Sequence, residues 1–199
     1  MPRTKEAFEA MREVTRQKIE AAALSLFARK GLSVTVGEIA EAAGVSKGLL
    51  YNHYPSKGAL IAELIRQAAQ ISAGTIKDFS ESNLSAGEII RQISFMMCEM
   101  LTTSYHGGIE FFMFMIQAGM SGFRLEQPLY DEKNPDPNVA FANVIAAGQR
   151  EGTVVDGDPV QLNMIFWAAI QGLCCYVMTG MELPITPKVL SRILLKEKY

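Results

Sequence analysis

The sequence is poor in cysteine and lacks a long uninterrupted apolar run. Its 199 residues include three cysteines, in no Cys-x-x-Cys or Cys/His spacing, which argues against a disulfide framework and a zinc site. The most apolar stretch, residues 164–178, is interrupted by Gln171 and is shorter than the roughly 20 residues of a membrane-spanning helix. The first residues contain no apolar segment that would make a secretory signal. We therefore expect a cytoplasmic protein with a buried helix at 164–178, no membrane partner, no metal and no cofactor.

A large net charge of either sign is also absent. The formal net charge is −2, with 19 Lys and Arg against 21 Asp and Glu. These charges are unevenly placed, because residues 1–60 hold nine Lys and Arg against six Glu, whereas the rest of the chain is acidic. The asymmetry indicates a polyanionic partner for the N-terminal part of the chain.

The motifs of common enzyme classes are missing as well. The sequence contains no nucleophile elbow, no glycine-rich phosphate loop, no His-Glu-x-x-His motif and no paired-carboxylate arrangement. We therefore predict that the protein is not an enzyme.

Apolar residues recur with the 3.6-residue period of a helix, and no strand-like alternation is present. Around Gly31, the chain changes from one long periodic segment to short, sharply bounded ones. Thr35 and Glu38 have the spacing of a capping box, Gly44 permits a tight turn, and Ser46 is suited to cap the next helix before Pro55 ends it. Two short helices joined by a glycine turn, after a longer helix, predict a helix-turn-helix.

Beyond residue 80 the periodic segments lengthen, and residues 121–137, rich in Gly, Pro, Asp and Asn, are expected to form a loop. The predicted helices of this part are 84–103, 108–120, 138–151, 159–181 and 186–197. The fold class is thus all-α. We assign residues 1–60 to a three-helix helix-turn-helix DNA-binding domain, and residues 61–199 to a helical effector-binding and dimerisation domain.

The short helix after Ser46 begins with two residues that do not favour helix stability. Lys47 places a cation at the positive end of the helix dipole, and Gly48 costs about 0.5–1 kcal/mol relative to Ala inside a helix. Both choices suit an external anion, because glycine permits close backbone approach and lysine supplies charge. Each could instead be an ordinary solvated residue. Further hydrogen-bonding groups follow on the same segment at Tyr51, Asn52, His53 and Lys57.

The segment 35–57, TVGEIAEAAGVSKGLLYNHYPSK, closely resembles the signature of the tetracycline-repressor-like (TetR) transcriptional regulators, and residues 19–31 resemble the preceding helix. The resemblance covers residues 15–65 strongly. It implies that Thr35 holds a phosphate and that Ser46 contacts either a phosphate or a base. An apolar Leu49 is the main departure, since it either touches a thymine methyl or only packs. By the same resemblance, base edges are read by Lys47, Gly48, Leu49 and Asn52, and phosphates are held by Tyr51, His53 and Lys57.

Methionine and aromatic residues are concentrated in the C-terminal part of the chain. Methionine adapts to irregular shapes and suits a pocket for an apolar ligand, although a Met/Phe stripe is more commonly helix core. The resemblance implies an effector pocket in this domain. We predict that it is lined by Met97, Met100, Phe112, Met113, Met164 and Trp167.

Small residues recur along the segment 159–181, at Ala168, Gly172 and Cys175. Small side chains permit close helix approach, which suits a four-helix dimer interface made with 138–151, although tight packing within one chain would use the same pattern. The resemblance implies a homodimer, and one short recognition helix reads too few base pairs to act alone.

The function predicted from the sequence is therefore a repressor that binds a palindromic DNA operator as a homodimer and is released by a small apolar or amphipathic ligand. A thiol- or metal-sensing regulator of the same fold is an alternative, with Cys98, Cys174 and Cys175 as candidate thiols. An activator is another alternative, because DNA contact does not fix the position on a promoter.

Overall fold

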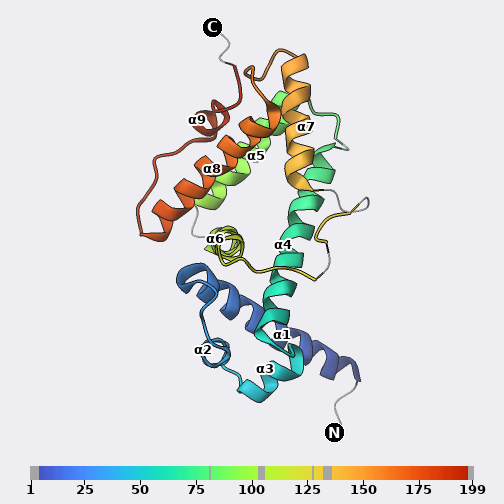
Figure 1. Ribbon diagram of the computed structural model, residues 1–199, viewed down its shortest axis with the longest axis vertical. Coiled ribbons are helices and arrows are strands. Elements are labelled where there is room, and N and C mark those ends of the chain that lie inside the picture. Colours follow the sequence, from blue (N-terminus) through green and yellow to red (C-terminus); the bar gives the residue numbers. More distant parts are fainter. Residues whose placement is uncertain (1–4, 81, 103–105, 127, 132–135, 197–199) are drawn as a thin grey trace. The chain divides into compact units, whose positions relative to one another are not determined.

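The computed structural model describes residues 5–80, 82–102, 106–126, 128–131 and 136–196. The described residues are mainly helical and contain no strand; an isolated bridge joins Val154 to Leu195. The all-α prediction is therefore confirmed. The helices, drawn in Figure 1, are α1 (Lys5–Lys30), α2 (Val36–Ala42), α3 (Lys47–His53), α4 (Lys57–Ser80), α5 (Ala86–Thr102), α6 (His106–Met120), α7 (Pro137–Arg150), α8 (Pro159–Met178) and α9 (Pro187–Ser191).

The chain forms two compact units. The first, called the head below, comprises Met1–Gln67 and Glu110–Leu125, and the second, called the body, comprises Ala68–Ile109 and Glu126–Tyr199. By this division the head extends past residue 60 and includes most of α6, which the sequence had assigned to the other domain. The reason is packing, because α6 contributes side chains to the core around α1. The division between the units falls within α4, after Gln67, and within α6, after Ile109.

The core of the head combines α1 with the short helices and with α6. Ile19, Phe27 and Leu50 are fully buried. The ring of Phe114 in α6 stacks on that of Phe27, with centroids 5.8 Å apart. Beside this pair, the hydroxyl of Ser25 donates to a carboxylate oxygen of Glu110 at 2.7 Å. The core of the head thus forms where the apolar face of α1 packs against apolar side chains of its neighbouring helices.

In the body, α5 packs against α7, α8 and α9, and α7 packs against α8. Phe141 and Phe166 are fully buried, with ring centroids 5.4 Å apart, and Trp167 contacts both rings edge-on. Gly148 allows α7 to approach its neighbours, since a Cβ there would lie 2.3 Å from a methyl carbon of Val154.

The helices of the body are shorter than predicted at two places. The predicted helix 186–197 is wrong in its second half, because α9 ends at Ser191 and the chain then turns. There, Val155 N–H donates to the carbonyl of Leu194 and Lys196 N–H donates to that of Thr153, so tertiary pairing replaces helical hydrogen bonds. Likewise, α8 ends at Met178 rather than 181, before Gly180 with its φ of 84°.

The expectation of a buried helix at 164–178 is also wrong for the single chain. Of the apolar residues of α8, Val160, Met164 and Ile165 are each more than half exposed. Among the described residues, α8 is the one helix whose length and apolar composition would allow it to cross a membrane. Only 22% of its most apolar stretch is buried. The described part of this chain therefore leaves these apolar side chains of α8 uncovered.

Candidate nucleic-acid interface

The first helix of the helix-turn-helix is fixed by the capping box that the sequence predicted. The Thr35 side chain accepts a hydrogen bond from Glu38 N–H, and the Glu38 carboxylate accepts one from Thr35 N–H. These bonds hold the pKa of Glu38 below its ordinary value, chiefly through the Thr35 backbone N–H. After α2, Gly44 adopts a φ of 66°, which a glycine takes without strain and which turns the chain toward α3.

The second helix, α3, presents nearly all of its side chains to solvent. Ser46 caps it by accepting from Leu49 N–H, and Leu50 is the buried residue that anchors it. Leu49 is 38% exposed and Tyr51 50% exposed, so neither is a core residue. Most of the predicted DNA-contacting residues are thus exposed, namely Thr35, Ser46, Lys47, Gly48, Leu49, Tyr51 and Asn52.

The side chain of Lys47 lies next to Gly37 of α2, a neighbour that the sequence pattern did not indicate. A Cβ on Gly37 would be 2.9 Å from Cε and 3.1 Å from Nζ of Lys47, so the absence of a side chain on Gly37 makes room for the lysine. The ammonium is thereby close to the first turn of α2, where Thr35 is the cap. At Gly48, by contrast, the nearest atom to an added Cβ is Ser46 Oγ at 3.9 Å, so the backbone of α3 is open to an approaching group.

Lys57 has a structural role that the sequence did not reveal. Its ammonium donates to the carbonyl oxygens of Leu32 at 2.8 Å and Val34 at 3.1 Å. These carbonyls belong to the connection between α1 and α2, so Lys57 joins the start of α4 to that connection. The predicted phosphate contact of Lys57 stays a prediction, and it would have to use the remaining donor of the ammonium group.

The residues predicted to line an effector pocket divide between the two units. Phe112 and Met113 belong to the part of α6 in the head, whereas the others lie in the body. Met113 is buried, but Met164 is 65% exposed on α8. That these six residues line one pocket stays a prediction.

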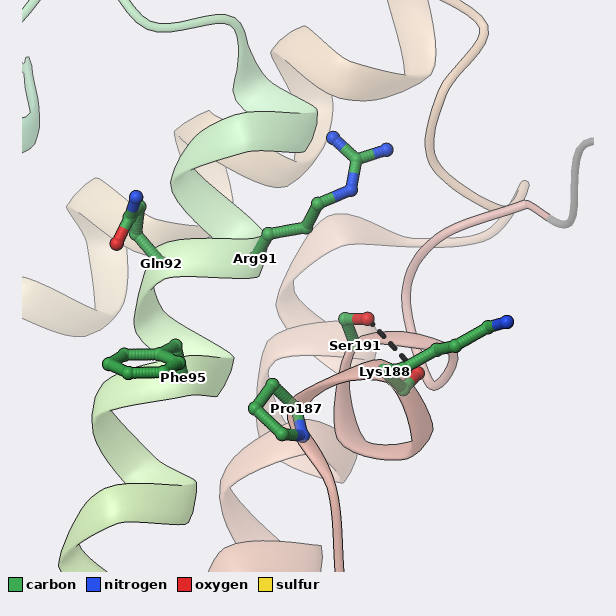
Figure 2. Close-up of a pocket in the computed structure, with 6 residues that line it drawn as sticks. All are labelled: Arg91, Gln92, Phe95, Pro187, Lys188 and Ser191. Atoms are coloured by element: carbon green, nitrogen blue, oxygen red, sulfur yellow. Dashed lines mark hydrogen bonds between the residues drawn. The ribbon is translucent and has the colours of Figure 1, made fainter.

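The body contains a hollow of about 540 Å³ between α5 and α9 (Figure 2). None of the six predicted pocket residues lines it. Its walls combine an exposed ring with two cations, and Ser191 Oγ donates to the Lys188 carbonyl at 3.1 Å. The lining residues are Arg91, Gln92, Phe95, Pro187, Lys188 and Ser191.

The three cysteines differ in accessibility. Burial raises the pKa of the Cys174 thiol to about 12 and also raises that of Cys98, so neither forms a thiolate readily near neutral pH. Cys175 is exposed on α8. Within the described part of the chain, no three His, Cys, Asp or Glu side chains are grouped so that they could hold a metal ion.

A capped short helix, a glycine turn and an exposed second helix with a basic first residue define a helix-turn-helix DNA-binding unit. Comparison with known proteins agrees. Residues 19–64 match the family model of bacterial regulatory proteins of the tetR family.

Relatives extend the similarity beyond this segment. The chain is 25% identical over 155 residues to the HTH-type transcriptional repressor KstR2 of Rhodococcus jostii, which covers 75% of this chain and 74% of KstR2. It is 40% identical over 82 residues to the HTH-type transcriptional regulator AcrR of Shigella flexneri, 41% of this chain and 33% of AcrR. The crystal structure of a gamma-butyrolactone receptor (ArpA-like protein) shares the fold, with a TM-score of 0.68 at 23% identity over 92% of this chain and 95% of the receptor.

These findings confirm the resemblance inferred from residues 35–57. Residues 19–64 are thus similar to the tetR family of bacterial regulatory proteins, and the relatives that match a longer part of the chain are helix-turn-helix transcription regulators.

Proposed function

We propose that the protein represses transcription as a homodimer on a near-palindromic DNA operator, and that a small apolar or amphipathic molecule releases it. The observation that carries the DNA-binding part is the exposure of α3, which buries Leu50 and leaves Lys47, Tyr51 and Asn52 accessible. Such a helix enters the major groove, where bidentate or methyl contacts distinguish bases.

The exposed face of α8 supports the homodimer. Val160, Met164, Ala168 and Gly172 follow one another at intervals of four residues, so they share one side of the helix. Nothing lies within 4 Å of a Cβ built on Gly172, which argues against close packing within the chain as the reason for the small residues. A second copy of α8 would cover this face and bury apolar area that is costly to leave in water.

Dimeric binding to DNA is tested by footprinting on fragments that the protein recovers from genomic DNA. We expect two half-sites whose centres are about 10 bp apart, or moderately farther if the DNA is bent. Protection of one unpaired half-site by a monomer would contradict the proposal.

Base reading is tested at Lys47. Lys47→Ala should weaken binding to the recovered operator by about 1–3 kcal/mol and affect mixed-sequence DNA less, because a base contact is specific. Lys30→Ala is the matched control, since Lys30 is an exposed lysine at the end of α1 that pairs with Glu38. An equal loss on both DNAs would show that Lys47 does not read a base.

Release by a ligand is supported by the Met- and aromatic-rich body, and the similar gamma-butyrolactone receptor is named for a small-molecule ligand. By linkage, a ligand that weakens operator binding 100-fold requires about 2.7 kcal/mol of coupling, and DNA must weaken ligand binding equally. A ligand screen by thermal shift, followed by operator titration with each hit, tests this. If every stabilising hit leaves operator affinity unchanged, the protein is not released in this way.

A further inference from the structure

The hollow between α5 and α9 combines apolar and positively charged groups within the body (Figure 2). All of its lining residues belong to the body, and none of them is acidic. Its volume of about 540 Å³ lies in the range of sites that hold small molecules. The chemistry of its walls therefore indicates which kind of molecule fits it.

Two helices that pack against each other fix the walls of the hollow. On α5, Phe95 lies one helical turn after Arg91, so the two side chains leave the same side of that helix. On α9, Pro187 and Ser191 are also one turn apart, and the buried Leu190 holds this short helix against the body. The hollow is thus a product of the packing of α9 on α5, which brings together residues from distant parts of the sequence.

The charged ends of Arg91 and Lys188 have no hydrogen-bond or ion-pair partner in the described part of the chain. Glu88, one turn before Arg91 on α5, is placed by its spacing to pair with that arginine. Instead, its carboxylate accepts from the N–H of Ser85 at 2.8 Å and from its hydroxyl at 2.7 Å. These bonds lower the pKa of Glu88 more than the charge of Arg91 does. The guanidinium is therefore left available to an external anion.

Two cations without an acidic neighbour among the lining residues stand out in this part of the chain. Residues 61–199 hold ten Lys and Arg against fifteen Asp and Glu, so this region as a whole repels anions. Glu88 is committed to the start of α5, and α9 itself contains no acidic residue. The hollow is thus a locally positive site on an acidic background.

The hollow also has an apolar end. The ring of Phe95 is 51% exposed, and in the view of Figure 2 it lies to the left of Pro187, whereas the charged ends of Arg91 and Lys188 lie to the right. An exposed ring gains favourable contact when a second ring packs against it, and a guanidinium binds a carboxylate through two parallel N–H donors. The separation of these two ends favours an amphipathic anion over a simple salt ion.

We propose that this hollow binds a small aromatic carboxylate, in which a carboxylate group is joined to a planar ring. Arg91 holds the carboxylate, Lys188 adds positive charge, and Phe95 packs against the ring. The site lies apart from the pocket expected from the sequence, since it uses none of the six residues predicted there. The inference goes beyond the proposed function, because it assigns a site and a ligand charge whether or not the protein represses transcription.

The ligand class is tested with three related probes, titrated into the full-length protein without DNA and followed by the backbone N–H signals in NMR spectra. Phenylpropionate has both a ring and a carboxylate, phenylpropionamide lacks the charge, and propionate lacks the ring. Phenylpropionate should shift the signals of Phe95, Lys188 and Ser191 saturably and bind at least about 10-fold more tightly than the other two. No saturable shift at these signals, or equal affinities for the acid and its amide, would overturn the proposal. Because DNA is absent, either result leaves the proposed repression standing.

The charged end of the site is tested by Arg91→Gln. This variant should bind phenylpropionate about 10- to 100-fold more weakly, because a hydrogen bond between charged groups is lost, and should bind the uncharged phenylpropionamide as the wild type does. Arg91 is exposed, so the variant should fold. Arg150→Gln is the matched control, since it removes an exposed arginine of α7 that does not line the hollow. Equal affinities of the two variants for phenylpropionate would refute the assignment of Arg91.

The apolar end is tested by Phe95→Ala, which also tests whether a second copy of the chain fills the hollow instead. The variant should bind the acid and its amide about 3- to 10-fold more weakly, because both lose the same ring contact. Met96→Ala removes the neighbouring exposed side chain, which does not line the hollow, and should keep both affinities. In sedimentation velocity, Phe95→Ala should behave as the wild type. Wild-type affinity for phenylpropionate, or a loss of self-association, would show that the hollow is not this ligand site.

Discussion

Helix α3 of the head and helix α8 of the body leave different kinds of side chain exposed. In the head, α3 buries Leu50 and exposes Lys47, Tyr51 and Asn52. In the body, α8 buries Asn163, Phe166, Ile170 and Cys174 and exposes a row of apolar residues. The polar surface suits DNA, whose grooves and phosphates offer hydrogen bonds and charge, whereas the apolar surface suits another protein.

The two units also fix their helices by different means. The helices α2 and α3 have seven residues each, too short to be stable alone, and each begins at a side-chain cap. In the body, longer helices are held by tertiary contacts such as the Phe141 and Phe166 rings and the approach of Gly148 to Val154. The stability of the head should therefore fall when a single anchoring residue or helix cap is substituted. The stability of the body should fall when packing contacts or the proposed dimer contact are lost.

The largest effect is expected at the anchor of α3. Leu50→Ala removes a fully buried side chain and should lower the free energy of unfolding by about 2–5 kcal/mol. Leu49→Ala, one residue away but 38% exposed, should change it by less than about 1 kcal/mol. Urea denaturation followed by circular dichroism measures both. Similar losses at the two positions would mean that α3 is not held by a single anchor.

The next effect concerns the apolar face of α8. Ile165→Glu should weaken self-association at least about 100-fold, or about 2.7 kcal/mol, because it places a charge in the proposed dimer interface. The single chain should still fold, since Ile165 is 56% exposed. Gln92→Glu adds the same charge to an exposed position of α5 and should leave the dimer intact. Sedimentation velocity distinguishes the two; a dimeric Ile165→Glu variant would place the interface elsewhere.

A smaller gain in stability is expected in the body. Asn163 is 4% exposed, and its Oδ1 has no hydrogen-bond partner among the described residues. Asn163→Leu should raise the free energy of unfolding by about 1 kcal/mol, because an unsatisfied buried polar group is removed. Asn83→Leu, at an exposed position, should have little effect. A loss of stability in Asn163→Leu would show that the amide is satisfied in the folded protein by a group such as a bound water.

The smallest effect is expected at the cap of α2. Thr35→Val should cost about 1 kcal/mol, since the N-terminal hydrogen bonds of the helix lose their acceptor. The contribution of Glu38 has a defined pH dependence. Its pKa is lowered in the folded head, so its stabilisation is present above its ordinary value and is lost as pH falls through the lowered one. Thermal melts of wild type and Thr35→Val between about pH 3 and 7 should converge at the acid end. A difference in melting temperature that stays constant with pH would show that the Thr35 cap does not depend on the charge of Glu38.

Prediction from sequence succeeded where a residue acts on its own neighbours in the chain. The Thr35–Glu38 box, the Ser46 cap and the turn at Gly44 are all as expected, because each depends on backbone bonds three or four residues away. It failed at the end of the chain, where the predicted helix 186–197 gives way after Ser191 to pairing with residues near Val154. No local pattern indicates a partner that lies 41 residues away in the sequence, as Leu195 does from Val154.

The sequence alone determined the helical class, the capped helix-turn-helix and the basic, hydrogen-bonding character of α3, because periodicity, caps and exposed side chains are properties of short segments. Only the tertiary structure decided that α6 contributes to the core of the head and that α8 leaves its apolar face uncovered. It also decided the internal partners of Lys57 and the burial of Glu20 against Tyr54. These features depend on which helices pack together. Burial and charge pairing between distant segments are set by that packing and not by the order of residues within either segment.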